Sequence, residues 1–134
     1  MISHRLFVAS ATLALVAVAC SPPPQSTPAP VAVTLSGAAT AGPTCPVESQ
    51  PPDPACAPRP VDGARILVID AEGAQVAEGM TDGRGLFSIE VPPGSYVLVA
   101  QPVDGLMGVP APHAVDVGPA GAGDIVLAYD TGIR

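Results

Sequence analysis

Hydrophobic and polar residues alternate with a period of two along most of the chain after residue 30. This is the pattern of strands that bury one face. In residues 86–91, for example, Phe87, Ile89 and Val91 share one side. No segment after residue 20 has a helical period of useful length, so the pattern predicts an all-β, seven-stranded antiparallel β-sandwich. The seven predicted strands lie around residues 31–35, 64–69, 75–80, 86–91, 96–100, 115–117 and 125–129.

Turn residues separate these segments. Glu72-Gly73 predicts one turn, and Thr81-Asp82-Gly83-Arg84-Gly85 predicts a hairpin, because glycine tolerates the positive φ angles of tight turns. Pro92-Pro93-Gly94 favours a type II turn with Pro93 and Gly94 in its central positions.

The N-terminus has the pattern of an export signal. A short segment containing Arg5 precedes an uncharged apolar run at 6–18, which is too short to span a bilayer, and Pro22-Pro23-Pro24 follows. Ala17-Val18-Ala19-Cys20 resembles a bacterial lipobox, although the family usually has Leu where Ala17 stands. The resemblance implies a signal peptide at 1–19, a diacylglyceryl group on Cys20 and often a third chain such as palmitate. The alternative is an ordinary secretory signal cleaved after Ala19, which would leave a free Cys20 thiol.

Three parts are therefore expected. Residues 1–19 form the signal peptide, 20–31 form the lipidated cysteine with a proline-rich tether, and 32–134 form the β-sandwich. About ten residues of polyproline-type spacer would lift the domain roughly 30 Å above the lipid. We expect the protein on the extracytoplasmic face of a bacterial membrane, held through the lipid on Cys20.

Composition narrows the partners. The 134 residues contain no lysine, and removal of 1–19 leaves four arginines against 12 acidic residues, a net side-chain charge of −8. An acidic surface without a basic stripe argues against nucleic acid. The absence of lysine also excludes the intramolecular isopeptide bonds of some pilin-like sandwiches. We expect a single small domain and a monomer.

Three segments carry a family resemblance, namely 61–68, 81–87 and 91–98. Val61-Asp62-Gly63-Ala64, Thr81-Asp82-Gly83-Arg84-Gly85 and Pro92-Pro93-Gly94-Ser95-Tyr96 are similar to carboxypeptidase regulatory-like domains. The resemblance covers about residues 61–130 and implies a transthyretin-like sandwich in a small bacterial lipoprotein. It implies no activity.

Two cysteines remain once Cys20 carries lipid. Cys45 and Cys56 lie in a proline-rich loop at 44–61, and outside the cell they are expected to form a disulfide. The alternatives are a metal site, for which the spacing is not C-x-x-C, and a redox-active pair.

Enzymatic chemistry has few candidates. His113 is the only histidine after the signal peptide, and Ser88 and Ser95 lie in other segments. Without a nucleophile, base and orienting group in one place, we expect no enzyme, no cofactor and no metal site. Five aspartates could offer oxygen ligands, but several precede glycine as turn residues do. They are Asp82, Asp104, Asp116, Asp124 and Asp130.

The function expected from the sequence is a non-catalytic, lipid-anchored envelope protein with a structural or protein-interaction role. The alternative is a small carbohydrate- or peptide-binding module. Sugar platforms usually need exposed aromatic rings, whereas Tyr96 and Tyr129 fall on the predicted inward face. The long loop at 102–112 carries Leu106 and Met107, which are interpreted either as a contact for an envelope protein or as a cap on the core.

Overall fold

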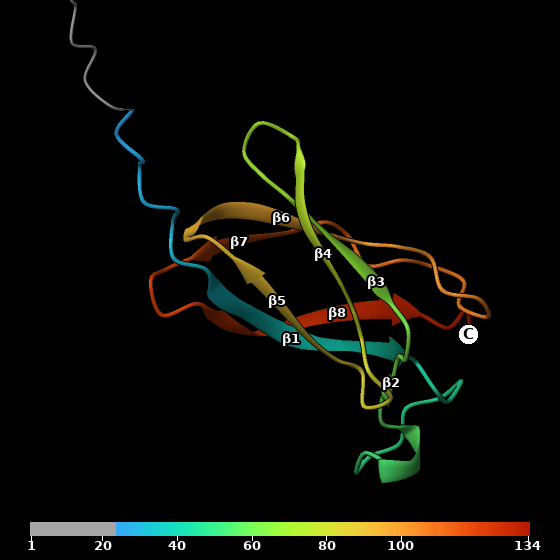
Figure 1. Cartoon of the computed structure of the whole chain (residues 1–134). Coiled ribbons are helices and arrows are strands. Elements are labelled where there is room, and N and C mark those ends of the chain that lie inside the picture. Colours follow the sequence, from blue (N-terminus) through green and yellow to red (C-terminus); the bar gives the residue numbers. More distant parts are fainter. Residues whose placement is uncertain (1–23) are drawn as a thin grey trace, which may run out of the picture.

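The structure, a computed structural model, describes residues 24–134 and consists of two packed β-sheets. The predicted signal peptide and Cys20 lie outside the described residues. Sheet A contains β1, β2, β5 and β8, and sheet B contains β3, β4, β6 and β7 (Figure 1). The strands are β1 (Val33–Gly42), β2 (Arg59–Pro60), β3 (Arg65–Ile69), β4 (Gln75–Met80), β5 (Leu86–Val91), β6 (Gly94–Ala100), β7 (His113–Val117) and β8 (Ala122–Asp130). One short 3₁₀ helix, η1 (Pro54–Cys56), lies in the loop between β1 and β2.

The all-β, two-sheet architecture is confirmed, with two differences in detail. The two-residue strand β2 was not expected. The pairing is not purely antiparallel either, because β8 runs parallel to β1, with Ala39 opposite Leu127. Val31, expected in the first strand, lies before it and is exposed.

The core lies between the sheets and follows the predicted alternation. Phe87, Ile89 and Val91 of β5 are all buried, as are Leu98 and Ala100 of β6. The alternating residues of β8 complete it, and they are Ile125, Leu127 and Tyr129. Burial of such side chains is the main stabilising contribution, at about 25 cal/mol per Å² of apolar surface.

The turn between β3 and β4 is confirmed. Asp70 Oδ1 accepts hydrogen bonds from the backbone N–H groups of Glu72 (3.0 Å) and Ala74 (2.8 Å). Gly73 has a φ of 85°, which a residue with a side chain rarely adopts. The result is a β-hairpin that projects from sheet B at the top of Figure 1.

Two other turn predictions need correction. Thr81–Gly85 is a tight turn, closed by hydrogen bonds from Arg84 N–H and Leu86 N–H to Asp82 Oδ1. It is not a hairpin, because it carries the chain from β4 in sheet B to β5 in sheet A. The type II turn at residues 92–94 is wrong, since it requires a positive φ at Gly94 and Gly94 has none.

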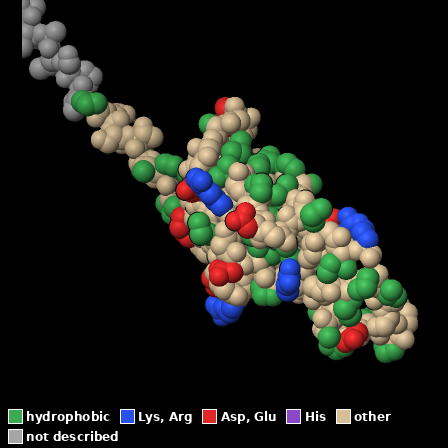
Figure 2. Space-filling model, turned by 90° about the vertical axis from the view of Figure 1, so that its right-hand side faces the viewer, with side chains coloured by type: hydrophobic (Ala, Val, Ile, Leu, Met, Phe, Trp, Pro, Cys, Tyr) green, Lys and Arg blue, Asp and Glu red, His purple; other side chains and the backbone are tan. Residues whose placement is uncertain are grey.

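The two ends of the sandwich carry different segments. The tether runs into Val33 at one end of β1, and the loop containing Cys45 and Cys56 leaves Gly42 at the other. Both views place the tether and this loop at opposite ends of the molecule (Figures 1 and 2). We call the end that carries residues 43–58, the 102–112 loop and residues 130–134 the distal end.

Candidate functional site

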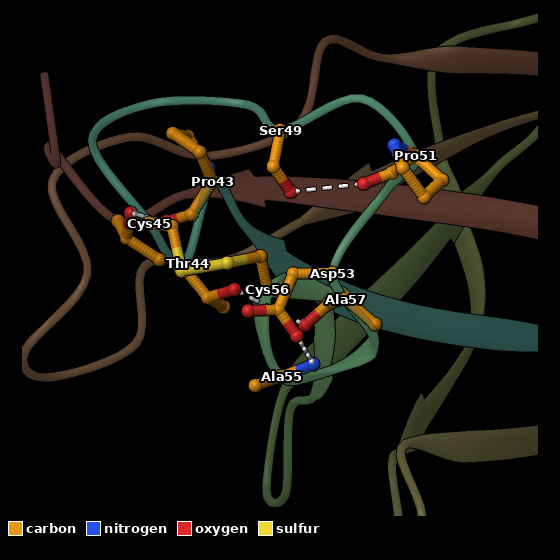
Figure 3. The surroundings of a disulfide bond; sticks show 10 residues. Pro43, Thr44, Cys45, Ser49, Pro51, Asp53, Ala55, Cys56 and Ala57 are labelled. Carbon is orange, nitrogen blue, oxygen red and sulfur yellow. Dashed lines mark hydrogen bonds between the residues drawn. A yellow bond between two sulfur atoms is a disulfide. The ribbon is translucent and has the colours of Figure 1, made fainter.

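The predicted Cys45–Cys56 disulfide is present at the distal end, with a Cα–Cα distance of 5.3 Å (Figure 3). Asp53 Oδ1 accepts a hydrogen bond from Ala55 N–H (2.9 Å) at the start of η1. Thr44 Oγ1 donates to the carbonyl oxygen of Ala57 (3.2 Å). The disulfide and these hydrogen bonds tie the two ends of the proline-rich loop together.

The loop is also fastened to sheet A. Strand β2 returns antiparallel to the end of β1, with Ala41 opposite Arg59. Thr131 follows β8, and its N–H donates to the carbonyl oxygen of Gly42 (3.2 Å). The Thr131 hydroxyl donates to the carbonyl oxygen of Pro43. The C-terminal residues therefore hold the start of the disulfide loop in place.

The 102–112 loop joins the same end through backbone contacts. Met107 N–H donates to the carbonyl oxygen of Asp130 (2.8 Å), and Gly108 and Asp130 exchange two further hydrogen bonds of 3.2 Å. These bonds cover the last residue of β8, which is otherwise an edge strand. The structure thus brings Cys45, Cys56 and Met107 to one end of the sandwich.

Leu106 and Met107 have different environments. Leu106 is partly buried and packs against the hydrophobic core. Met107 is 80% exposed, and its side chain lies against Gly132, where an added Cβ would overlap Met107 Cγ. The capping interpretation therefore describes Leu106, and the exposed-contact interpretation describes Met107.

Several hydrophobic side chains at the distal end face solvent. Val47 is 77% exposed, and Val109 and Ile133 are also exposed. Figure 2 shows hydrophobic side chains, prolines included, on the disulfide loop at the end away from the tether. The sequence did not predict an exposed contact at Val47, Val109 or Ile133. Isolated aliphatic residues within proline- and glycine-rich segments were the available signal.

Two hollows flank the disulfide. One of about 540 Å³ is lined by loop residues that include Glu48, Pro52 and Pro54. The other, of about 440 Å³, lies between the loop and sheet A and includes Val47, Cys45 and Ala128 in its lining. Apolar walls with a few carboxylates suit a peptide or protein contact better than a small charged ligand.

One ion pair lies at the distal end. Arg134 Nη2 lies 2.8 Å from Asp130 Oδ2. The hydrogen bond from Arg134, together with one from Gly132 N–H, lowers the pKa of Asp130 from 3.8 to about 2. Asp130 is therefore ionised at neutral pH. Its side chain binds Gly132 and Arg134, while its backbone binds the 102–112 loop.

The candidate catalytic residues are not brought together. His113 begins β7 in sheet B, whereas Ser88 lies on β5 in sheet A, opposite Ser36. Ser95 Oγ donates to Asp116 Oδ1 (2.6 Å) between β6 and β7. His113 is paired instead with Leu98, three positions further along β6. Within residues 24–134, neither Ser88 nor Ser95 lies beside His113 as acyl transfer would require.

The described residues also offer neither a cluster of metal ligands nor an exposed tyrosine ring for sugar stacking. Within residues 24–134 no group of three or more histidine, cysteine, aspartate or glutamate side chains could hold a metal ion. Tyr129 is 2% exposed, and its hydroxyl donates to the carbonyl oxygen of Gln101 (2.8 Å). Burial raises its pKa above 10. Tyr96 is partly buried against the core and donates to the carbonyl oxygen of Pro92 (2.7 Å), so neither ring offers the exposed face that sugar stacking uses.

None of the helices in the described part of the chain is long and apolar enough to cross a membrane.

Comparisons with known proteins show similarity of fold only. No protein-family model matches the chain, and no curated protein matches it. The Bacillus anthracis TIE protein is similar in structure, with a TM-score of 0.52 and 17% identity over 73% of this chain and 17% of that one. BcpA, the major pilin subunit of Bacillus cereus, has a TM-score of 0.47 and 14% identity over 75% of this chain and 31% of that one. The chain thus spans less than a third of the length of either protein.

Proposed function

We propose that this protein is a non-catalytic, lipid-anchored envelope protein whose transthyretin-like β-sandwich presents its distal end to a protein partner. The observation that carries the proposal is the arrangement of the two ends. The proline-rich tether enters at Val33, and the disulfide loop, Met107 and the C-terminal residues lie at the opposite end (Figure 1). With a lipid on Cys20, the distal end would face away from the membrane.

The distal end has the properties of a contact surface. Exposed apolar side chains on a rigid support can pack against a partner without a large loss of conformational entropy. The disulfide, the Asp53 cap and the hydrogen bonds of Thr131 supply that rigidity. The neighbouring carboxylates of Glu48 and Asp53 would disfavour an acidic partner.

The anchor is tested by the intact mass of the full-length protein recovered from membrane fractions, with and without reductant. Cleavage before Cys20 plus a diacylglyceryl group, with a gain of about two daltons on reduction, is the expected result. An unmodified mass in the culture medium would contradict the anchor. It would instead support a secreted protein with a free Cys20.

The contact surface is tested separately, by co-purification from the membrane. A Val47→Ser, Met107→Ser double variant changes two side chains that are at least 77% exposed, so it should fold and lose the partner. Leu86→Ser, on the outer face of sheet A, is the matched control and should retain it. Leu106→Ser is expected to lower stability, because Leu106 packs against the core. Equal recovery of the partner with both surface variants would contradict the proposal.

A further inference from the structure

The outer face of sheet B is apolar at its centre. Its two central strands, β3 and β6, are hydrophobic at successive positions, unlike β5, where polar residues alternate with buried ones. Leu67 lies opposite Val99, and Ile69 lies opposite Val97. These four side chains are partly exposed, and none of them is among the residues that pack against the core. They form a continuous patch, extended by Ala114 beside Val97.

Polar groups lie at both ends of this patch. Arg65 and Glu78 form an ion pair of 2.5 Å at one end. Ser95 and Asp116 are hydrogen-bonded at the other. An apolar centre with a polar rim is the usual anatomy of a protein interface, and strands that are apolar on both sides are usually covered on both sides.

The two ends of the patch differ in charge. At one end the charges of Arg65 and Glu78 balance each other, and Arg65 is the only arginine or lysine in the strands of sheet B. About 20 Å away, six residues along β6 at about 3.4 Å each, lies a hollow of about 230 Å³. Asp70, Ser95 and Asp116 contribute to its lining.

A second copy of this chain fits these features. Two sheets packed face to face, related by a twofold axis that runs across the strands, would place the Arg65 end of each copy over the acidic hollow of the other. Arg65 binds Glu78 through Nε and Nη2, and among the described residues Nη1 makes no hydrogen bond. Nη1 can therefore donate to a carboxylate of the second copy while the internal ion pair stays intact.

We propose that the outer face of sheet B binds a second copy of this chain, with Arg65 of each copy directed into the hollow between Asp70 and Asp116 of the other. The proposal is therefore a weak dimer, where the sequence led us to expect a monomer. Four strands about 4.8 Å apart and about 20 Å long present roughly 400 Å². A standard interface buries about 800 Å² per partner, so the dimer should dissociate on dilution.

Photocrosslinking in cells tests this proposal with the full-length chain. A photoreactive amino acid replaces Ala114, which is exposed at the rim of the patch. The expected product has twice the mass of the protein and contains only its peptides. Cells and medium are analysed together, so the result does not depend on the lipid anchor or on a partner at the distal end.

Three variants make the result specific. Val97→Glu places a charge at the centre of the patch and should lower the yield of the product about tenfold or more. Arg65→Gln should lower it about threefold, as for one exposed ion pair. Val126→Glu, on the outer face of sheet A, should leave it unchanged. Circular dichroism of each purified variant establishes that the fold is retained.

Several results would overturn the proposal. They are the absence of any product, a product that contains a different protein, and an equal loss of product in Val126→Glu and Val97→Glu. If Val97→Glu does not fold, Val99→Glu takes its place, because Val99 lies in the same patch, opposite Leu67. Val99→Glu must give the same loss of product for the proposal to stand.

Discussion

The two sheets of this protein are assembled in different ways. Sheet B joins β3 to β4 and β6 to β7, so two of its three pairings link strands that are consecutive in the chain. In sheet A every pairing involves β1, and one of its partners, β8, is the last strand in the sequence. The sheets also differ on their outer faces. The outer face of sheet B is apolar at its centre, and that of sheet A carries small residues of β1, such as Ser36 and Ala38, beside the exposed Leu86 and Val126.

The difference shows that the correct pairing of strands needs more specific packing in sheet A than in sheet B. A hairpin such as β3–β4 brings its strands together through a short turn, which is closed here by Asp70 and Gly73. The pairing of β1 with β8 must close a loop of roughly 80 residues, and such long-range contacts form only after their entropy cost is met. Sheet A should therefore depend more strongly on close packing along β1.

Replacement of Gly37 by Ala tests this dependence and should have the largest effect. A Cβ at Gly37 would overlap the backbone carbonyl oxygen of Ile125 and would lie 2.7 Å from Phe87 Cζ. Because backbone cannot move aside as a side chain can, β1 and β8 would have to separate. We expect the free energy of unfolding to fall by about 3 kcal/mol or more in urea denaturation.

Gly79→Ala is the counterpart in sheet B. Its Cβ would lie 2.5 Å from Cγ1 of the buried Ile89, which would have to repack but is not backbone, so we expect a smaller loss of about 1–2 kcal/mol. Gly83→Ala meets nothing within 4 Å and should change stability by less than about 0.5 kcal/mol. If Gly37→Ala and Gly79→Ala cost the same, the contrast between the sheets would lose its support.

Removal of the disulfide tests how much the loop at 43–58 contributes to stability, apart from the two sheets. The chain-entropy model gives up to about 3 kcal/mol for a Cys45→Ser, Cys56→Ser variant that opens this closed loop. The sandwich should survive, because the buried core lies within 35–129 but includes neither cysteine. We expect a lower melting temperature, native-like circular dichroism and faster proteolysis within 43–58.

Proteolysis with mass spectrometry locates the change. Cleavage confined to the disulfide loop is the expected pattern. Early cleavage within β5 or β8 would mean that the loop stabilises sheet A itself. The comparison of the two sheets would then have to include the disulfide as part of sheet A.

Thr81 tests the junction between the sheets. It is buried at the end of β4, its hydroxyl donates to the carbonyl oxygen of Val61 (2.6 Å), and it accepts from Ala64 N–H (2.8 Å). Val61 N–H in turn donates to the carbonyl oxygen of Ala39 in sheet A (3.0 Å). Thr81→Val leaves two buried backbone groups without partners and should cost about 2 kcal/mol.

The matched control is Thr34→Val. The Thr34 hydroxyl donates to Glu90 on the exposed side of sheet A, where water can replace it, so we expect a change below about 0.5 kcal/mol. Equal losses in the two variants, measured by thermal unfolding, would be evidence against a structural role for Thr81 between the sheets.

The sequence predicts the local features of this fold well. The period of two identifies the inward residues of β5, β6 and β8, and the Asp-Gly and Glu-Gly dipeptides mark real turns. It does not predict the pairing of β1 with β8, because nothing in either segment states which distant strand lies beside it. It also fails at Thr81–Gly85, where a turn typical of hairpins connects two different sheets.

For the candidate site, too, the local features are predicted from the sequence and the tertiary contacts are not. Cys45 and Cys56 were paired correctly because only one pairing was available once Cys20 was set aside. The role of Thr131 in holding the disulfide loop depends on tertiary contacts with Gly42 and Pro43, about 90 positions away, and no local pattern carries that information. The apolar run at 66–69 did indicate a strand, but not that its second face would be left uncovered.

The smallest effect is expected from pH, and it concerns the end of β8. The hydrogen bond and charge of Arg134, with Gly132 N–H, lower the pKa of Asp130 to about 2, below its ordinary value of 3.8. A carboxyl group whose pKa is lower in the folded than in the unfolded state stabilises the fold above the unfolded pKa. That contribution is complete above about pH 4 and is lost as the pH falls toward 2.

Asp130→Asn should therefore be less stable than the wild type at pH 7, and the difference should shrink as the pH falls from about 4 to 2. Arg134→Gln removes the main cause, so the pKa of Asp130 should rise toward 3.8 while the hydrogen bond from Gly132 keeps part of the shift. NMR titration of the Asp130 carboxyl group measures this directly. A value near 3.8 in the folded wild type would show that the C-terminal residues do not hold Asp130.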